Sequence, residues 1–217
     1  PTPDARLRLA QIFQRLRAPQ KALAVLDAAA DALAANPPAG YMTQLASAFL
    51  AAGKAGQGLK RFEGLRGAGQ SPEVAAGWAV LAATAGQESA VLEWLQREPA
   101  LSDDLLRDLY FAASGARVPK LALAAARRLF SQVPDPRWRL LLARSLLETG
   151  DAAAALDHIQ RLLPGDPEIR QLHLETLMAS GDKKAARRIW TERLNAPGAA
   201  EAAREEAVYA LLDLGAA

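Results

Sequence analysis

The sequence predicts an all-α protein in which antiparallel helix pairs stack into a solenoid. The first observation is composition, because 51% of the 217 residues are hydrophobic and only 6% are aromatic. Most of the hydrophobic residues are Ala and Leu, which favour helices, while Val, Ile and Thr, which favour strands, are scarce. The second observation is a short apolar run that ends in Gly and recurs along the chain. The third is a polar residue followed by Pro, which alternates with these runs.

Charge and cysteine content limit the functions that the chain can perform. Its 26 basic and 24 acidic residues give a net charge of +2, so we expect no extended basic surface and no nucleic-acid partner. Because Cys is absent, the chain has neither a disulfide nor a Cys-ligated zinc site. No apolar run reaches the roughly 18 residues of a membrane helix, so we expect no membrane segment. Since the chain starts at Pro1 and ends inside a predicted helix, we expect a fragment of a longer array.

The recurrent Gly predicts where the two helices of a pair meet. A helix that reverses direction within a few residues usually ends on a residue with positive φ, which costs Gly least. In the first unit, Arg17 and Ala18 stand where later units have Gly. Successive Gly residues are 29 to 35 apart, close to a repeat of about 34 residues. They are Gly53, Gly86, Gly115, Gly150, Gly181 and Gly215.

The polar residue before Pro predicts where each pair begins, with the polar residue as N-cap and Pro in the first turn. These dipeptides are Asn36-Pro37, Ser71-Pro72, Glu98-Pro99, Asp135-Pro136 and Asp166-Pro167. We therefore expect one solenoid over 1–217, with about six helix pairs and one unpaired final helix. Its units are 4–36, 37–70, 71–99, 100–134, 135–165, 166–197 and a partial 199–217. The unpaired helix is expected to expose apolar surface and to permit weak self-association.

Large and small apolar positions recur in the order that one repeat family uses. The clearest unit has Leu142, Ala143, Leu146, Gly150, Ala155, Ile159, Leu162 and Pro167, and a second has Leu45, Ala46, Phe49, Gly53, Gly58, Phe62 and Leu65. This pattern resembles the tetratricopeptide repeat family over essentially the whole chain. The resemblance implies a right-handed superhelical solenoid whose first helices line a concave groove.

The sequence presents no recognisable catalytic or metal-binding constellation. His158 and His173 are the only histidines, and neither has a carboxylate or second His at a spacing that suits metal ligation. No nucleophile elbow, phosphate-binding loop or prominent carboxylate pair is present. We therefore expect a protein that is not an enzyme and that carries no cofactor and no metal.

The resemblance implies which side chains face the groove. In the N-terminal half these include Thr43, Ser47, Glu73, Val80, Leu105 and Leu109. In the C-terminal half the groove is more polar, and we select six residues there as candidates for partner binding: Arg137, Arg144, Gln171, Glu175, Glu205 and Tyr209. The alternative is that these polar residues only solvate the groove.

The Ala-, Leu- and Arg-rich units are also similar to the periplasmic repeat arrays of bacterial outer-membrane exopolysaccharide export proteins, of the Pel, cellulose or alginate type. That similarity implies a non-enzymatic scaffold of biofilm polysaccharide secretion, located in the periplasm. It would dock a polysaccharide-modifying enzyme and could stimulate it. Two alternatives remain open: a cytoplasmic adaptor for complex assembly or regulation, and a solenoid that binds polysaccharide directly.

Overall fold

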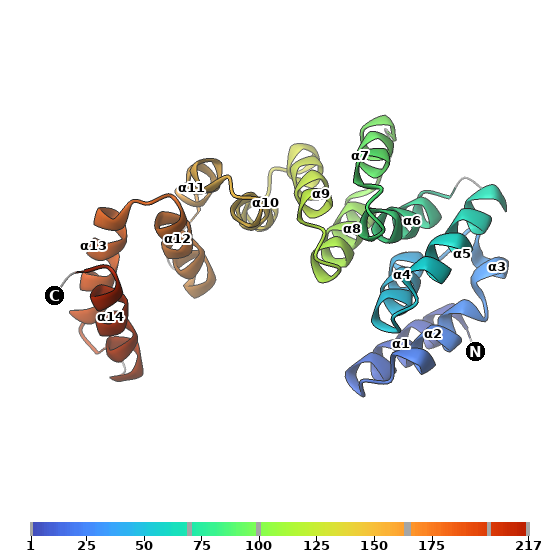
Figure 1. The fold of residues 1–217 in the computed structure, drawn as a ribbon, viewed down its shortest axis with the longest axis horizontal. Helices are drawn as coiled ribbons and strands as arrows, with labels where there is room; N and C mark the ends of the chain where they lie inside the picture. The colour runs from blue at the N-terminus through green and yellow to red at the C-terminus, as the bar shows by residue number, and fades with distance from the viewer. Residues whose placement is uncertain (1, 69–70, 99–100, 163–165, 199–200, 216–217) are drawn as a thin grey trace. The chain divides into compact units, whose positions relative to one another are not determined.

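The computed structural model is all-α, and it describes residues 2–68, 71–98, 101–162, 166–198 and 201–215. These residues form 14 helices and no strand (Figure 1). Neighbouring helices pack against one another along the chain, which confirms the predicted all-α class and helix-pair repeat. The helices fall into two compact units, unit 1 (Pro1–Pro134) and unit 2 (Asp135–Ala217).

Unit 1 contains four helix pairs and one additional helical turn. The first helices of the pairs are α1 (Pro3–Arg15), α4 (Tyr41–Ala51), α6 (Pro72–Thr84) and α8 (Asp103–Gly115). Their partners are α2 (Pro19–Asp27), α5 (Ala55–Ala68), α7 (Glu88–Arg97) and α9 (Pro119–Gln132), and the short α3 (Ala30–Leu33) follows α2. Because α6 also packs against α4, α5 and α8, the pairs are joined into one core.

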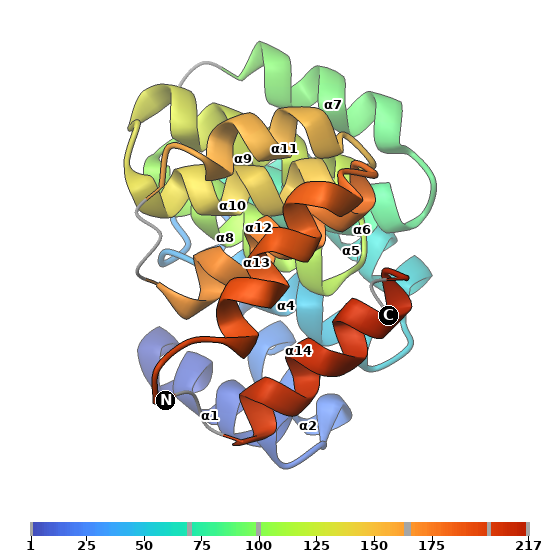
Figure 2. The same cartoon turned by 90° about the vertical axis from the view of Figure 1, so that its left-hand side faces the viewer.

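Unit 2 contains two helix pairs and a final helix. The pairs are α10 (Pro136–Glu148) with α11 (Ala152–Ile159) and α12 (Pro167–Ala179) with α13 (Lys183–Leu194). The final helix, α14 (Glu201–Asp213), lies beside α13 (Figures 1 and 2). Trp190 and Ala207 are buried in the core between them. On its outer side α14 exposes three apolar or aromatic side chains, Val208, Tyr209 and Leu212.

The turn inside each pair has a constant register. A residue with positive φ lies two positions before the second helix, as Gly53 does before α5 and Gly150 before α11. The prediction for Gly115 is wrong, because Gly115 is the last residue of α8 and the positive φ of 58° belongs to Arg117. Because Pro119 begins α9, the residue with positive φ is the one two positions before this proline, Arg117. Arg17, with φ of 53°, has the same place before α2, as the first unit predicts.

Three of the five predicted pair starts are confirmed. Ser71, Asp135 and Asp166 are N-caps, each followed by Pro in the first turn. Asp135 accepts a hydrogen bond from the Arg137 backbone N–H at 2.7 Å, and Asp166 accepts one from the Glu168 N–H at 2.8 Å. Such bonds satisfy backbone donors that have no partner within the helix.

The starts predicted at Asn36-Pro37 and Glu98-Pro99 are wrong. α4 begins later, at Tyr41, and α8 begins at Asp103 behind Ser102, whose hydroxyl accepts from the Leu105 N–H. Pro37 precedes Pro38 and is therefore driven out of the helical region, so no helix can begin there. Glu98 is the C-cap that ends α7 and does not begin a helix. Several predicted unit boundaries lie outside the described residues: Gln70, Pro99, Ala100, Gly165, Ala199 and Ala217.

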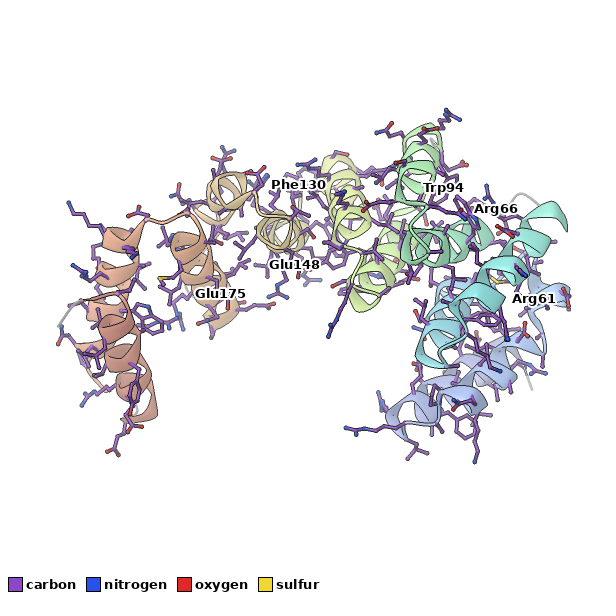
Figure 3. The ribbon with its side chains drawn as sticks, viewed as in Figure 1. Arg61, Arg66, Trp94, Phe130, Glu148 and Glu175 are labelled. Atoms are coloured by element: carbon purple, nitrogen blue, oxygen red, sulfur yellow. The ribbon has the colours of Figure 1, made fainter. Side chains whose placement is uncertain are left out.

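An ion pair joins the first two helix pairs and so helps to place α1 and α4 side by side. Arg61 on α5 donates from Nε to Asp27 at 2.9 Å and from Nη1 and Nη2 to the two carboxylate oxygens of Asp31 at 2.7 and 2.8 Å (Figure 3). The two parallel bonds to Asp31 form the bidentate geometry for which a guanidinium is suited.

The centre of unit 1 is α6, nine of whose thirteen residues are buried. Gly77 lets this helix approach its neighbours closely. A Cβ at this position would lie 2.8 Å from the Met42 backbone oxygen and 2.8 Å from Phe62 Cζ. Both Met42 and Phe62 are fully buried, so neither can move aside freely.

We expect Gly77→Ala to destabilise the protein by about 1–3 kcal/mol, because the overpacking outweighs the better helix propensity of Ala. The matched control is Gly64→Ala in α5, where an added Cβ meets nothing within 4 Å. That variant should gain about 0.5–1 kcal/mol. Urea unfolding followed by circular dichroism measures both. Equal stabilisation of the two variants would contradict the close approach of α6.

Candidate functional site

The six candidate residues selected from the sequence lie on the first helices of unit 2. Arg137 and Arg144 are on α10, Gln171 and Glu175 on α12, and Glu205 and Tyr209 on α14. Arg144 is partly exposed, and the other five side chains are exposed. Glu175 projects from α12 into solvent (Figure 3).

The structure brings only some of these residues together. Arg144 Nη2 donates to Glu168 Oε1 at 2.7 Å and thereby links α10 to α12. Gln171 Nε2 donates to Glu175 Oε1 at 3.0 Å along α12. Within the described part of unit 2, no hydrogen bond or ion pair of the side chains joins Arg137, Glu205 or Tyr209 to these residues. Arg144 therefore already has a structural partner.

Three of the groove positions expected in the N-terminal half are wrong. Val80, Leu105 and Leu109 are buried in the core of unit 1. The reason is that α6 is enclosed by α4, α5, α7 and α8, so the sides of α6 and α8 that face each other have no access to solvent. Thr43 and Ser47, by contrast, do line a pocket.

This pocket lies on α1, α4 and α8, the first helices of three pairs in unit 1, and has a volume of about 360 Å³. We call it the unit 1 pocket. One part of its wall is apolar and includes Leu7, Phe111 and Ala112. The other part is polar and is formed by Gln11, Thr43, Gln44, Ser47 and Asp108. The pocket thus offers both a hydrophobic surface and hydrogen-bonding groups.

Phe111 is the main apolar feature of the unit 1 pocket. Its side chain is 55% exposed, although its neighbour Tyr110 is buried. The two rings meet edge to face, with centroids 5.1 Å apart and an interplanar angle of 78°. Because Tyr110 is fixed in the core, this contact orients the exposed ring before any partner arrives.

Asp108 is the acidic feature of the pocket, and Gly40 makes room for it. Gly40 precedes α4 with a φ of 74°, and a Cβ there would lie 2.9 Å from Asp108 Oδ2. The carboxylate therefore lies against the backbone in space that a Cβ at residue 40 would occupy. Thr43 Oγ1 donates to the Gly40 carbonyl at 3.1 Å and steadies this turn.

A second carboxylate, Glu73, lies behind Gly40 at the start of α6. The pKa of Glu73 is raised to about 7, mainly by burial and also by the charges of Asp108 and Asp104, while a backbone hydrogen bond from Gly40 opposes the rise. Burial also raises the pKa of Asp108, against the opposing effect of Arg107. Within the described residues, the buried Glu73 Oε2 has no hydrogen-bond partner.

Sequence reasoning identified Glu73, Thr43 and Ser47 but missed Asp108 and Phe111. A signal was present, since Asp104, Asp108 and Phe111 follow one another at i, i+4 and i+7 and so share one face of α8. The groove face of this helix was instead predicted to contain the apolar Leu105 and Leu109, which are buried.

No group of three or more His, Asp or Glu side chains in the described ranges is arranged to hold a metal ion. None of the helices in those ranges is long and apolar enough to cross a membrane.

The raised pKa of Glu73 predicts a pH dependence of stability. The folded state holds this proton more tightly than the unfolded chain, so the contribution is present below the unfolded value of about 4.5 and is lost as pH rises through about 7. Glu73→Gln removes this pH-dependent contribution to stability, because the amide does not titrate. From about pH 5 to about pH 8, the free energy of unfolding of wild type should therefore fall by on the order of 1–2 kcal/mol relative to that of this variant.

Urea unfolding at the two pH values measures the difference. Glu63→Gln, which removes an exposed carboxylate on α5, is the control and should follow wild type at both. If the free energies of unfolding of wild type and Glu73→Gln differ by the same amount at both pH values, the burial of Glu73 is contradicted.

Comparison with known proteins gives no relative: no protein-family model matches the chain, and no curated protein matches it. The proposed function therefore rests on the arrangement of the side chains in the two units.

Proposed function

We propose that the chain is a non-enzymatic scaffold that binds a partner protein through the exposed faces of its first helices. The observation that carries this proposal is the unit 1 pocket, where the Phe111 ring remains largely exposed beside hydrogen-bonding side chains. A large aromatic side chain held in place at the surface contributes little to folding. It is the kind of anchor that a partner covers at the centre of an interface.

The first helices of unit 2 support the same proposal. Gln171 and Glu175 are exposed on α12, and Tyr209 is exposed on α14. None of these three side chains is needed to fill the core of the unit. Tyr is favoured at interfaces because its ring offers apolar area and its hydroxyl a hydrogen bond.

For the partner, we propose a polysaccharide-modifying enzyme of the bacterial periplasm, docked near an exopolysaccharide export pore. This part of the proposal rests on the similarity of the Ala-, Leu- and Arg-rich units to the repeat arrays of export proteins. A cytoplasmic adaptor built on the same helix pairs is the alternative. The identity of the captured partner distinguishes the two.

Direct binding of a polysaccharide is a second candidate function, and one observation favours it. In the unit 1 pocket, Phe111 lies with the amides of Gln11 and Gln44 and the carboxylate of Asp108. A sugar ring presents an apolar face that stacks on aromatic rings and hydroxyls that bond to amides and carboxylates.

The first test of the scaffold is capture from a periplasmic extract of a Gram-negative bacterium, with quantitative mass spectrometry. Phe111→Ala should reduce the retained partner by about tenfold, as expected for an aromatic anchor. Val133→Ala is the control, because Val133 is an exposed apolar residue at the end of α9, a second helix, and does not line the pocket. Tyr209→Ala probes unit 2 in the same way.

The identity of the retained proteins decides between the partner classes. A polysaccharide deacetylase or hydrolase that is lost in Phe111→Ala supports the export proposal and the pocket together. Cytosolic assembly proteins would favour the adaptor. If Phe111→Ala and Tyr209→Ala both retain the partner as wild type does, the first-helix faces are not the binding surface. Retardation of the chain in polysaccharide-containing gels, abolished by Phe111→Ala, would favour direct polysaccharide binding.

We also propose weak self-association through α14, whose Val208, Tyr209 and Leu212 are exposed. Leu212→Lys should shift the chain toward monomer in sedimentation velocity at high concentration, because a charge in an apolar contact is costly. Leu16→Lys, which changes an exposed apolar residue at the C-cap of α1, is the control. Wild-type protein that stays strictly monomeric over the whole concentration range would rule out this contact.

A further inference from the structure

We propose that the unit 1 pocket accepts the cationic end of a lysine or arginine side chain from the partner protein. The inference rests on the proposed function as a protein-binding scaffold, and it names the chemistry that the pocket selects. The observations that support it are the negative charge at and around Asp108, the exposed ring of Phe111 and the hydrogen-bond acceptors in the pocket lining.

The charge around Asp108 is negative and is only partly compensated. Glu73, Asp104 and Asp108 interact with one another, and Arg107 is the cation that lowers the pKa of Asp108. Arg107 Nη1 is 2.7 Å from Asp104 Oδ1, whereas its Nη2 is 3.5 Å from Asp108 Oδ1. The guanidinium therefore pairs mainly with Asp104, and the three carboxylates carry an excess of two negative charges when all are ionised.

No other described charge enters the unit 1 pocket. Asp108 is the only ionisable residue in its lining, because α1 supplies Leu7 and Gln11, and α4 supplies neutral side chains such as Gln44. An incoming cation thus meets no positive charge in the lining and faces a half-buried carboxylate, which Arg107 contacts only at 3.5 Å. An incoming anion would face repulsion from Asp108, and an apolar side chain would cover that carboxylate without pairing it.

Glu73 adds an observation that is independent of the pocket lining. Its Oε2 is buried and has no hydrogen-bond partner among the described residues, and its charge interacts with that of Asp108. Buried polar atoms normally have a partner, so an orphaned carboxylate oxygen needs an explanation. A cation bound at Asp108 would offset the repulsion between the two carboxylates and favour their ionised forms.

Phe111 provides the second part of the recognition. A cation within about 6 Å of an aromatic centroid is attracted by the negative face of the ring. The edge contact with Tyr110 holds this ring in place, and Leu7 and Ala112 offer apolar surface to the methylene stem of a lysine or arginine. The amide oxygen of Gln44 and the hydroxyl of Ser47 can accept hydrogen bonds from an ammonium or a guanidinium.

The test is a titration of the isotope-labelled 217-residue chain by amide NMR at about pH 8, where the carboxyl groups are ionised. The probes are N-acetyl-lysine amide and N-acetyl-arginine amide, with N-acetyl-norleucine amide as the uncharged analogue of lysine. We expect saturable shifts at Gly40, Asp108 and Phe111 with both cationic probes. The affinity for norleucine amide should be lower by about tenfold or more.

Two variants test the residues that make the site. Asp108→Asn should weaken binding of the cationic probes by about tenfold, and Phe111→Leu by about threefold, since Leu keeps an apolar surface but has no aromatic face. Asp103→Asn, which removes an exposed carboxylate from the same helix, is the matched control and should bind as wild type does. Retained amide dispersion in each spectrum establishes that the variant is folded.

Equal binding of norleucine amide would overturn the proposal, as would the absence of saturable shifts with either cationic probe. Glucosamine that binds where both amino-acid probes fail would also overturn it, and would point to a cationic polysaccharide instead. These outcomes are distinct from a failure of the scaffold itself. If Phe111→Ala still loses the captured partner while the cationic probes do not bind, the scaffold stands and only the chemistry of the pocket is wrong.

Discussion

The turn within each helix pair is the constraint on which the rest of the structure depends. Its residue with positive φ lies two positions before the second helix, and the next backbone N–H donates to the carbonyl five residues earlier. Lys54 donates to Phe49 at 2.9 Å and Val118 to Ala113 at 2.9 Å in this way. This geometry reverses the chain in two residues and satisfies the last carbonyls of the first helix. It therefore sets each second helix against its first and leaves the first helices beside one another.

Much of this fold could be read from the sequence, because its signals are local. Ala and Leu content, recurrent Gly and polar-Pro dipeptides predicted helix pairs correctly. The wrong predictions concern a turn and a helix start at which one residue pattern is compatible with two positions. At Gly115 the turn register is set by Pro119, which moves the positive φ to Arg117 at a cost of about 1 kcal/mol for a residue with a side chain. At Asn36, two successive prolines prevent a helix start.

The candidate site was less predictable, because it depends on tertiary packing. Glu73 was expected to face the groove, but no local pattern indicates that its carboxylate would lie behind Gly40 and interact with Asp108, 35 residues away in sequence. That juxtaposition arises because α6 is buried and draws α4 and α8 together. The same burial explains why Val80, Leu105 and Leu109 belong to the core. Apolar residues at groove positions can be assigned only when the neighbours of a helix are known.

The enclosure of α6 also limits how this array can change by recombination. Repeat proteins can gain or lose units when each unit meets only the one before and the one after it. Here α4 also packs on α8, which belongs to the pair after the next, and Gly77 is fitted to Met42 and Phe62 of the preceding pair. Deleting or duplicating the α6–α7 pair would leave at least two mismatched surfaces. We therefore expect unit 1 to tolerate such a change only as a whole, although its sequence consists of repeats.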